Sequence, residues 1–258
     1  LDECLKGKEI KHETCFDLPG ESAQYFEVTY SPYYDSDGSI THAIVVFHNI
    51  TERKMAEREL ERSYQRLRET FNETVYALSA FVEMRDPYTA GHQNRVAKIA
   101  KAIAEEMGLP EDCTEGIWVA SLIHDIGKIG VPSDILTKPG RLTKAEFELI
   151  KEHPQTGYEI LKQIEFPWPI AEIVYQHHEK IDGSGYPQGL KGENILLESR
   201  IIGVADVVEA MSSHRPYREA LGLSAALEEI KKNKNILYDA KVVDACLKIF
   251  LEKGFELN

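Results

Sequence analysis

Hydrophobic and polar positions change their spacing along the chain, and the first part has the pattern of strands. Residues 25–30 and 40–47 are rich in aromatic and β-branched side chains, and they flank the turn sequence Asp-Ser-Asp-Gly at 35–38. Two such runs around an Asp-Gly turn predict a β-hairpin. Because an isolated hairpin is barely stable in water, we expect residues 1–50 to need more sheet or a partner chain.

The second part, residues 51–85, has a helical pattern that begins at a suitable N-cap, Thr51. Two series of residues recur every seven positions, offset by four: Leu60, Leu67, Thr74 and Phe81, and then Tyr64, Phe71 and Leu78. This spacing is typical of a coiled-coil seam, so we predict a homodimer through residues 51–85. The alternative is an amphipathic helix packed against its own chain, since Asn72, Thr74 and Arg85 weaken the seam.

The third part, residues 86–258, is predicted to be helical throughout. Val96, Ile99 and Ile103 form an apolar stripe at helical spacing, and Thr143 with Glu146 forms a capping box. The long irregular stretch at 179–194 is rich in glycine, and long loops inside compact domains are usually functional. The fold class expected for the whole chain is therefore mainly α, with a small β region and a linker helix before a helical domain.

Composition narrows the classes of function. The 258 residues carry 43 acidic and 30 basic side chains, a net charge of -13, which argues against binding to duplex nucleic acid. No run of about 18 apolar residues occurs, so no membrane span is expected. Four scattered cysteines without a CxxC pair, and an N-terminus without an apolar signal core, predict a reduced, cytoplasmic protein.

Five of the nine histidines stand in positions that suggest chemistry. They share a place inside a predicted helix or at its end, as do two aspartates: His92, His124, His153, His177 and His178, with Asp125 and Asp206. His153 is expected to end a helix, because Pro154 follows it. His177-His178 opens the glycine-rich stretch.

A buried imidazole or carboxylate is costly unless it is paired or bound to a metal. One such residue is more often a hydrogen-bonded core group, but seven together favour a metal site. Imidazole and carboxylate suit iron, manganese, zinc or nickel. Seven ligands exceed what one ion usually takes, and an aspartate able to bridge indicates a binuclear centre with ions about 3.5–4 Å apart.

Three segments carry a resemblance to a known family: HDIGKIGVP at 124–132, HHEKIDGSGYPQGLKG at 177–192 and ADVVEAMSSHRPYR at 205–218. They resemble the HD-GYP phosphodiesterases, over about residues 85–258. The resemblance implies an all-helical, metal-dependent HD-type hydrolase domain at 86–258. Its typical substrate is cyclic di-GMP, opened to pGpG and in some members to GMP.

The junction at residues 47–54 resembles the end of a PAS sensor domain, where the last strand runs into a signalling helix. That resemblance covers only the C-terminal half of a PAS fold. It implies a partial PAS-like sensory region at 1–50 that regulates the enzyme through the helix at 51–85.

The HD-GYP resemblance also implies residue roles. One divalent ion would be held by His92, His124, Asp125 and Asp206, and a second by His153, His177, His178 and the same Asp125. The two ions would be iron or manganese, with zinc, nickel or magnesium as alternatives. A hydroxide between them would attack the phosphodiester, so His124, Asp125 and Lys128 are the expected catalytic residues. Lys128 would neutralise a phosphate oxygen or assist the leaving O3′.

Substrate contacts are expected from Lys128, Tyr186, Arg215 and Arg218. The chain departs from the family at Tyr88, where some members have a glutamate that binds a third ion, and this favours two ions. It departs mildly at Glu209, where aspartate is usual. Two alternatives remain at this point: a cyclic dinucleotide receptor or scaffold, and a phosphodiesterase that prefers cyclic GMP-AMP. A general HD nucleotidase is disfavoured, because the Gly-Tyr-Pro loop and Arg215 would be superfluous to it.

Overall fold

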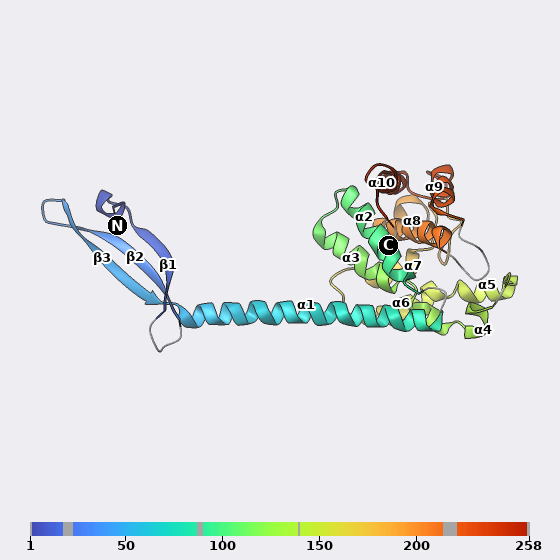
Figure 1. Ribbon diagram of the computed structural model, residues 1–258, viewed down its shortest axis with the longest axis horizontal. Coiled ribbons are helices and arrows are strands. Elements are labelled where there is room, and N and C mark those ends of the chain that lie inside the picture. The colour runs from blue at the N-terminus through green and yellow to red at the C-terminus, as the bar shows by residue number, and fades with distance from the viewer. Residues whose placement is uncertain (1, 18–22, 87–89, 139, 214–220, 257–258) are drawn as a thin grey trace. The chain divides into compact units, whose positions relative to one another are not determined.

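The chain forms two compact units, residues Leu1–Phe71 and Asn72–Asn258. The structure is a computed structural model (Figure 1), and it describes residues 2–17, 23–86, 90–138, 140–213 and 221–256.

The first unit contains a three-stranded antiparallel sheet in the order β1-β2-β3. Its strands are β1 (Ile10–Phe16), β2 (Gln24–Tyr34) and β3 (Ile40–Asn49), preceded by the single turn η1 (Cys4–Lys6). The predicted hairpin is confirmed as β2 and β3, with the Gly38 N–H donating to the Asp35 carbonyl at 2.9 Å. The strand β1 was not predicted. The PAS-like region is thus only a small sheet.

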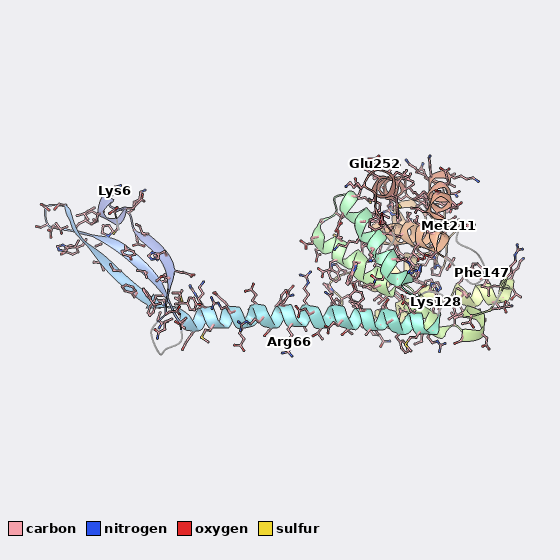
Figure 2. All side chains as sticks on the ribbon, in the orientation of Figure 1. Lys6, Arg66, Lys128, Phe147, Met211 and Glu252 are labelled. Atoms are coloured by element: carbon pink, nitrogen blue, oxygen red, sulfur yellow. The ribbon has the colours of Figure 1, made fainter. Side chains whose placement is uncertain are left out.

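Helix α1 (Thr51–Arg85) follows the sheet, as the pattern predicts. The residues at the start of the predicted seam, Leu60, Tyr64 and Leu67, are 72, 65 and 69% exposed. Arg66 also projects from this part of the helix (Figure 2). In the second unit, α1 instead buries Val75 and Val82, which are not seam positions. The buried positions of α1 in this unit are therefore offset from the seam positions by one residue.

The second unit is helical, which confirms the mainly α fold class. Its elements are α2 (His92–Glu106), α3 (Glu111–Ile123), η3 (Ile126–Gly130), α4 (Ser133–Leu136), α5 (Lys144–Ile150), α6 (His153–Leu161), α7 (Ile170–Gln176), η4 (Gly192–Asn194), α8 (Leu197–Ser212), α9 (Leu223–Lys232) and α10 (Ala240–Leu251). Helix α2 lies at the centre, packed against α3, α8 and α10. The predicted stripe Val96, Ile99 and Ile103 is fully buried there.

Two helix boundaries near the site test the sequence interpretation. The capping box of Thr143 and Glu146 is confirmed at the start of α5. The prediction that His153 ends a helix is wrong, because α5 ends at Ile150 and His153 begins α6. Pro154 then lies in the first turn of α6, where its missing N–H costs nothing and its fixed φ suits the helix. No described helix combines the length and hydropathy needed to cross a membrane.

Candidate metal centre

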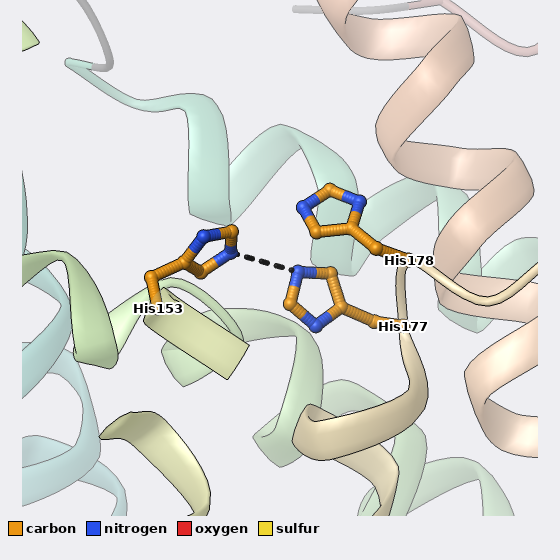
Figure 3. Close-up of side chains that lie close together, drawn as sticks. All are labelled: His153, His177 and His178. Carbon is orange, nitrogen blue, oxygen red and sulfur yellow. Dashed lines mark hydrogen bonds between the residues drawn. The ribbon is translucent and has the colours of Figure 1, made fainter. Parts of the chain in front are cut away.

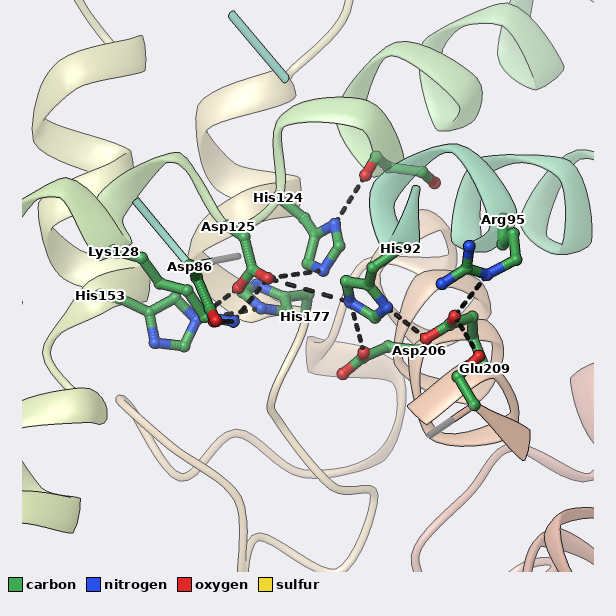
Figure 4. Close-up of polar contacts among 12 residues, drawn as sticks. Asp86, His92, Arg95, His124, Asp125, Lys128, His153, His177, Asp206 and Glu209 are labelled. Carbon is green, nitrogen blue, oxygen red and sulfur yellow. Dashed lines mark hydrogen bonds and ion pairs between the residues drawn. The ribbon is translucent and has the colours of Figure 1, made fainter. Parts of the chain in front are cut away.

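Five segments of the second unit bring the seven predicted metal ligands together. Figure 4 labels all of them except His178. His92 begins α2, His153 begins α6, and Asp206 lies within α8. The pair His124-Asp125 joins α3 to η3, and the pair His177-His178 follows α7. All of these side chains are buried except His178 and Asp206, which are partly exposed.

The ligand atoms fall into two outer groups and one group between them. His153, His177 and His178 form one outer group (Figure 3), and His92, His124 and Asp206 form the other. In each group the candidate ligand atoms lie within 4.8 Å of one another, and His124, Asp125 and His177 form a third such group. The spacing suits two neighbouring ions, although the assignment of each residue as a ligand stays a prediction.

Asp125 lies between the two outer groups. Its Oδ1 is 3.4 Å from His153 Nε2, while its Oδ2 is 3.6 Å from His124 Nε2 and 3.9 Å from His92 Nε2. One carboxylate oxygen therefore faces each outer group. A carboxylate in that position has the geometry required of a bridging ligand.

Three of the histidines are oriented by the same kind of hydrogen bond to the backbone. The Nδ1 atoms of His124, His153 and His177 each lie 2.5–2.6 Å from the backbone carbonyl three residues earlier. Because a carbonyl only accepts a hydrogen bond, each Nδ1 carries the proton and donates it. The Nε2 lone pair is left for an ion, as in protein metal sites generally.

Burial sets the charge of most of these groups. It lowers the pKa of His153 to about 4 and that of His177 to about 3, and it holds the pKa of His178 well below its usual range. Burial opposes ionisation of Asp125, but the charge of the nearby Lys128 ammonium keeps its pKa well below the usual value. Neutral imidazoles with an ionised carboxylate form a donor set that fits divalent transition metals.

Glu209 is a site residue that the sequence interpretation treated only as a mild departure from the family, without a role. It is 1% exposed, and its Oε2 makes a very short contact with His92 Nδ1. Its Oε1 accepts from Arg95 Nε at 2.7 Å and from Ser213 Oγ at 2.6 Å. His92 Nε2 thereby faces Asp206 Oδ1, 3.3 Å away. Glu209 follows Asp206 by three residues, so both lie on one face of α8. This spacing was the sequence signal that could have identified Glu209 as a site residue.

The same carboxylates determine the charge of His92. Burial alone would lower its pKa, but the hydrogen bonds that His92 donates to the Asp206 and Glu209 carboxylates outweigh burial and raise it to about 9. Burial also opposes ionisation of Glu209, yet the bond to His92 lowers its pKa to about 2. Glu209 is thus an anion that holds His92, a predicted metal ligand, through Nδ1, the ring nitrogen that does not face Asp206.

Replacing Glu209 with glutamine is expected to weaken metal binding about 10–100-fold, the usual cost of removing a carboxylate behind a ligating histidine. The amide is a weaker acceptor, and it lacks the charge that Arg95 and His92 require. Affinity is measured by competition with a chromophoric chelator. Glu165→Gln, at an exposed position, is the control. Equal affinities for the two variants would contradict the orienting role of Glu209.

Lys128 lies beside this cluster, in η3. Its Nζ is 2.7 Å from Asp125 Oδ2 and 3.8 Å from Oδ2 of Asp86, to which the sequence interpretation gave no role in the site. The preceding residue, Arg85, donates from Nη2 to the Val131 carbonyl at 3.2 Å. The end of α1 is therefore joined to the segment that carries Lys128, whose catalytic role stays a prediction.

The glycine-rich loop is anchored by Glu179, another residue without a predicted role. The buried Glu179 carboxylate accepts three backbone N–H groups, from Gln188 at 2.6 Å, Gly189 at 3.1 Å and Leu190 at 3.0 Å. This loop places the Tyr186 ring 4.8 Å from the His178 ring. Three further predictions, for Tyr88, Arg215 and Arg218, lie outside the described residues.

Comparison with known proteins identifies the family. A family model described as "HD domain" matches residues 76–242. The chain belongs to the HD domain family, and the fold expected from its motifs is confirmed.

Two relatives have names that state an enzymatic activity. The chain is 42% identical over 194 residues to "Cyclic di-GMP phosphodiesterase response regulator RpfG" of Xanthomonas campestris pv. campestris, covering 74% of this chain and 51% of that protein. It is 39% identical over 176 residues to "3'3'-cGAMP-specific phosphodiesterase 3" of Vibrio cholerae, covering 67% of this chain and 38% of that protein. The chain thus spans about half or less of the length of these relatives.

Among solved structures, the fold resembles Bd1817, an HDGYP protein from Bdellovibrio bacteriovorus. The TM-score is 0.52 with 17% sequence identity, and the match covers 70% of this chain and 64% of that one. This likeness concerns the fold.

Proposed function

We propose that this chain is a metal-dependent phosphodiesterase that hydrolyses cyclic di-GMP to pGpG. The position of Asp125 between two groups of histidines carries the proposal, because one carboxylate there serves two ions. The names of the relatives support the substrate class. The acidic chain supplies a local positive charge to a phosphodiester through Lys128 and the bound ions.

One ion would be held by His92, His124, Asp125 and Asp206, and the other by His153, His177, His178 and Asp125. Divalent cations held there would lower the pKa of a bound water and neutralise charge on the scissile phosphate. In the hydrolysis, a water oxygen forms the new P–O bond and releases its proton to solvent, while the P–O3′ bond breaks. Lys128 Nζ can supply the proton that the leaving O3′ needs, and Asp125 holds that ammonium 2.7 Å away.

A second candidate is a phosphodiesterase that prefers cyclic GMP-AMP, favoured by the likeness to the Vibrio cholerae enzyme of that name. The two substrates share the phosphodiester and differ in one base. A non-catalytic receptor is a weaker candidate, since a receptor does not need all seven predicted ligands together with Lys128.

The test is hydrolysis by the purified chain, reconstituted anaerobically with Fe(II) or Mn(II). Cyclic di-GMP and cyclic GMP-AMP are supplied in parallel, and products are separated chromatographically. Linear pGpG, or GMP, from cyclic di-GMP would support the proposal, and faster cleavage of cyclic GMP-AMP would support the second candidate. No product from either, with two ions bound per chain, would overturn both and favour the receptor.

We also propose that residues 51–85 form a homodimer that joins a PAS-like sensory region, 1–50, to the enzymatic domain, 86–258. The exposed seam residues Leu60, Tyr64 and Leu67 support a second copy as the partner. Leu67→Glu is expected to give monomers of 29.3 kDa in light scattering, while Gln65→Glu, which adds the same charge beside the seam, stays dimeric. A monomeric wild-type chain would contradict the proposal.

A further inference from the structure

The short helix α5 carries an aromatic residue that is partly exposed to solvent. None of its residues is buried, and Phe147 is 44% exposed (Figure 2). The helix is nevertheless held in place by the Thr143–Glu146 capping box. Lys138 Nζ reinforces this by lying 2.7 Å from the Glu146 carboxylate. A fixed helix that presents an aromatic ring to solvent is suited to binding a flat ligand.

Lys151 connects this ring to the glycine-rich loop. Its ammonium lies 5.1 Å from the centre of the Phe147 ring and 5.7 Å from the centre of the Tyr186 ring. Glu148 Oε1, 2.8 Å away, balances its charge. Both rings are therefore within 6 Å of one cation that is still partly exposed.

The cluster continues to the metal centre. Tyr186 contacts the ring of His178, a predicted ligand, and the loop that carries Tyr186 is fixed by Glu179 through three backbone N–H groups. A phosphodiester held at the ions would thus have the Tyr186, Lys151 and Phe147 side chains along one side. A base attached to that phosphate through its ribose would reach this cluster.

We infer that Phe147 and Lys151 form a subsite for one guanine base of a cyclic dinucleotide, an inference that rests on the proposed function. The Phe147 ring provides a stacking surface for the base. The Lys151 ammonium donates to O6 and N7, the two adjacent acceptors on the guanine edge. Adenine has an amino donor in place of O6, so the ammonium disfavours it. The subsite therefore selects guanine over adenine.

The experiment compares cyclic di-GMP with bis(p-nitrophenyl) phosphate, a phosphodiester without a base. Phe147→Ala and Lys151→Met are each expected to raise KM for cyclic di-GMP about 10-fold, as loss of one base contact does. The ratio of kcat/KM for cyclic di-GMP to that for bis(p-nitrophenyl) phosphate falls by the same factor. Leu149→Ala is the control, because Leu149 is similarly exposed on the same helix but has no aromatic ring on which a base can stack.

The outcomes separate this inference from the proposed function. An unchanged ratio in both variants, or an equal loss on both substrates, would overturn the subsite. If the wild-type chain cleaves bis(p-nitrophenyl) phosphate but neither dinucleotide, the proposed function fails. Equilibrium dialysis of cyclic di-GMP then tests the subsite by itself: a 10-fold higher Kd for Phe147→Ala supports it, and an unchanged Kd overturns it.

Cyclic di-AMP should bind more weakly than cyclic di-GMP to the wild-type chain, and equal binding would refute the selection of guanine.

Discussion

Asp125→Ala is expected to reduce the metal content from two ions per chain to none. Asp125 is the residue whose two oxygens face the two outer groups, one toward His153 and one toward His124 and His92. Its removal therefore takes a ligand from each ion and a negative charge from both. It also leaves Lys128 without the carboxylate at 2.7 Å, so that its ammonium keeps only the more distant Asp86 carboxylate, at 3.8 Å, as an anionic neighbour. Hydrolysis should fall below detection.

Metal content is measured by elemental mass spectrometry after gel filtration, with circular dichroism to verify the fold. Asp112→Ala, at an exposed position on α3, is the control and should keep both ions. Asp125→Asn separates charge from shape, because it keeps one oxygen acceptor, and it should lose at least one ion. Two ions retained by a folded Asp125→Ala protein would refute the bridging role.

Gly127→Ala is expected to be the most destabilising single-methyl change in the catalytic region. A Cβ at this position would lie 1.8 Å from the His153 carbonyl oxygen and 2.5 Å from the Gly157 nitrogen. Both are backbone atoms of α6, so the clash cannot be relieved by a rotamer change. We expect a loss of about 3 kcal/mol or more, the upper end for overpacking. For a unit of this size that corresponds to a Tm lower by roughly 6–12 °C.

Thermal unfolding of the metal-free protein measures the effect directly. Gly130→Ala is a matched control in the same short helix, since its Cβ would meet the Thr156 side chain at 3.3 Å, and that side chain can move. Displacement of α6 also shifts His153, so Gly127→Ala should bind its second ion weakly. Equal Tm values for the two variants would show that α6 and η3 are not in backbone contact.

The parts of the fold that were predictable rest on local signals. The hairpin follows from its Asp-Gly turn, and α5 follows from the Thr143–Glu146 box. The strand β1 gave no such signal, because its sequence IKHETCF is mostly polar and is extended through pairing with β2. His153 was misplaced because α5 and α6 are separated by two residues, so that one helical periodicity runs through both.

The site was predictable to the extent that its residues are chemically unusual. Buried histidines and aspartates require partners, so the cluster was expected before its geometry was known. The glutamates that support the cluster could not be recognised in this way from the sequence. Glu209 and Glu179 act through contacts with residues or backbone groups that only the tertiary fold brings close. A glutamate in a helical or loop sequence is otherwise typical of the surface.

The order in which the predicted ligands occur along the chain bears on how the protein matures. They come from five segments, and the first and last, His92 and Asp206, belong to helices α2 and α8 that pack against each other. During synthesis the set is incomplete until α8 has left the ribosome and docked. The proposed centre would thus be complete only in the finished domain, and its ions would be selected after folding, from those that the surroundings then supply.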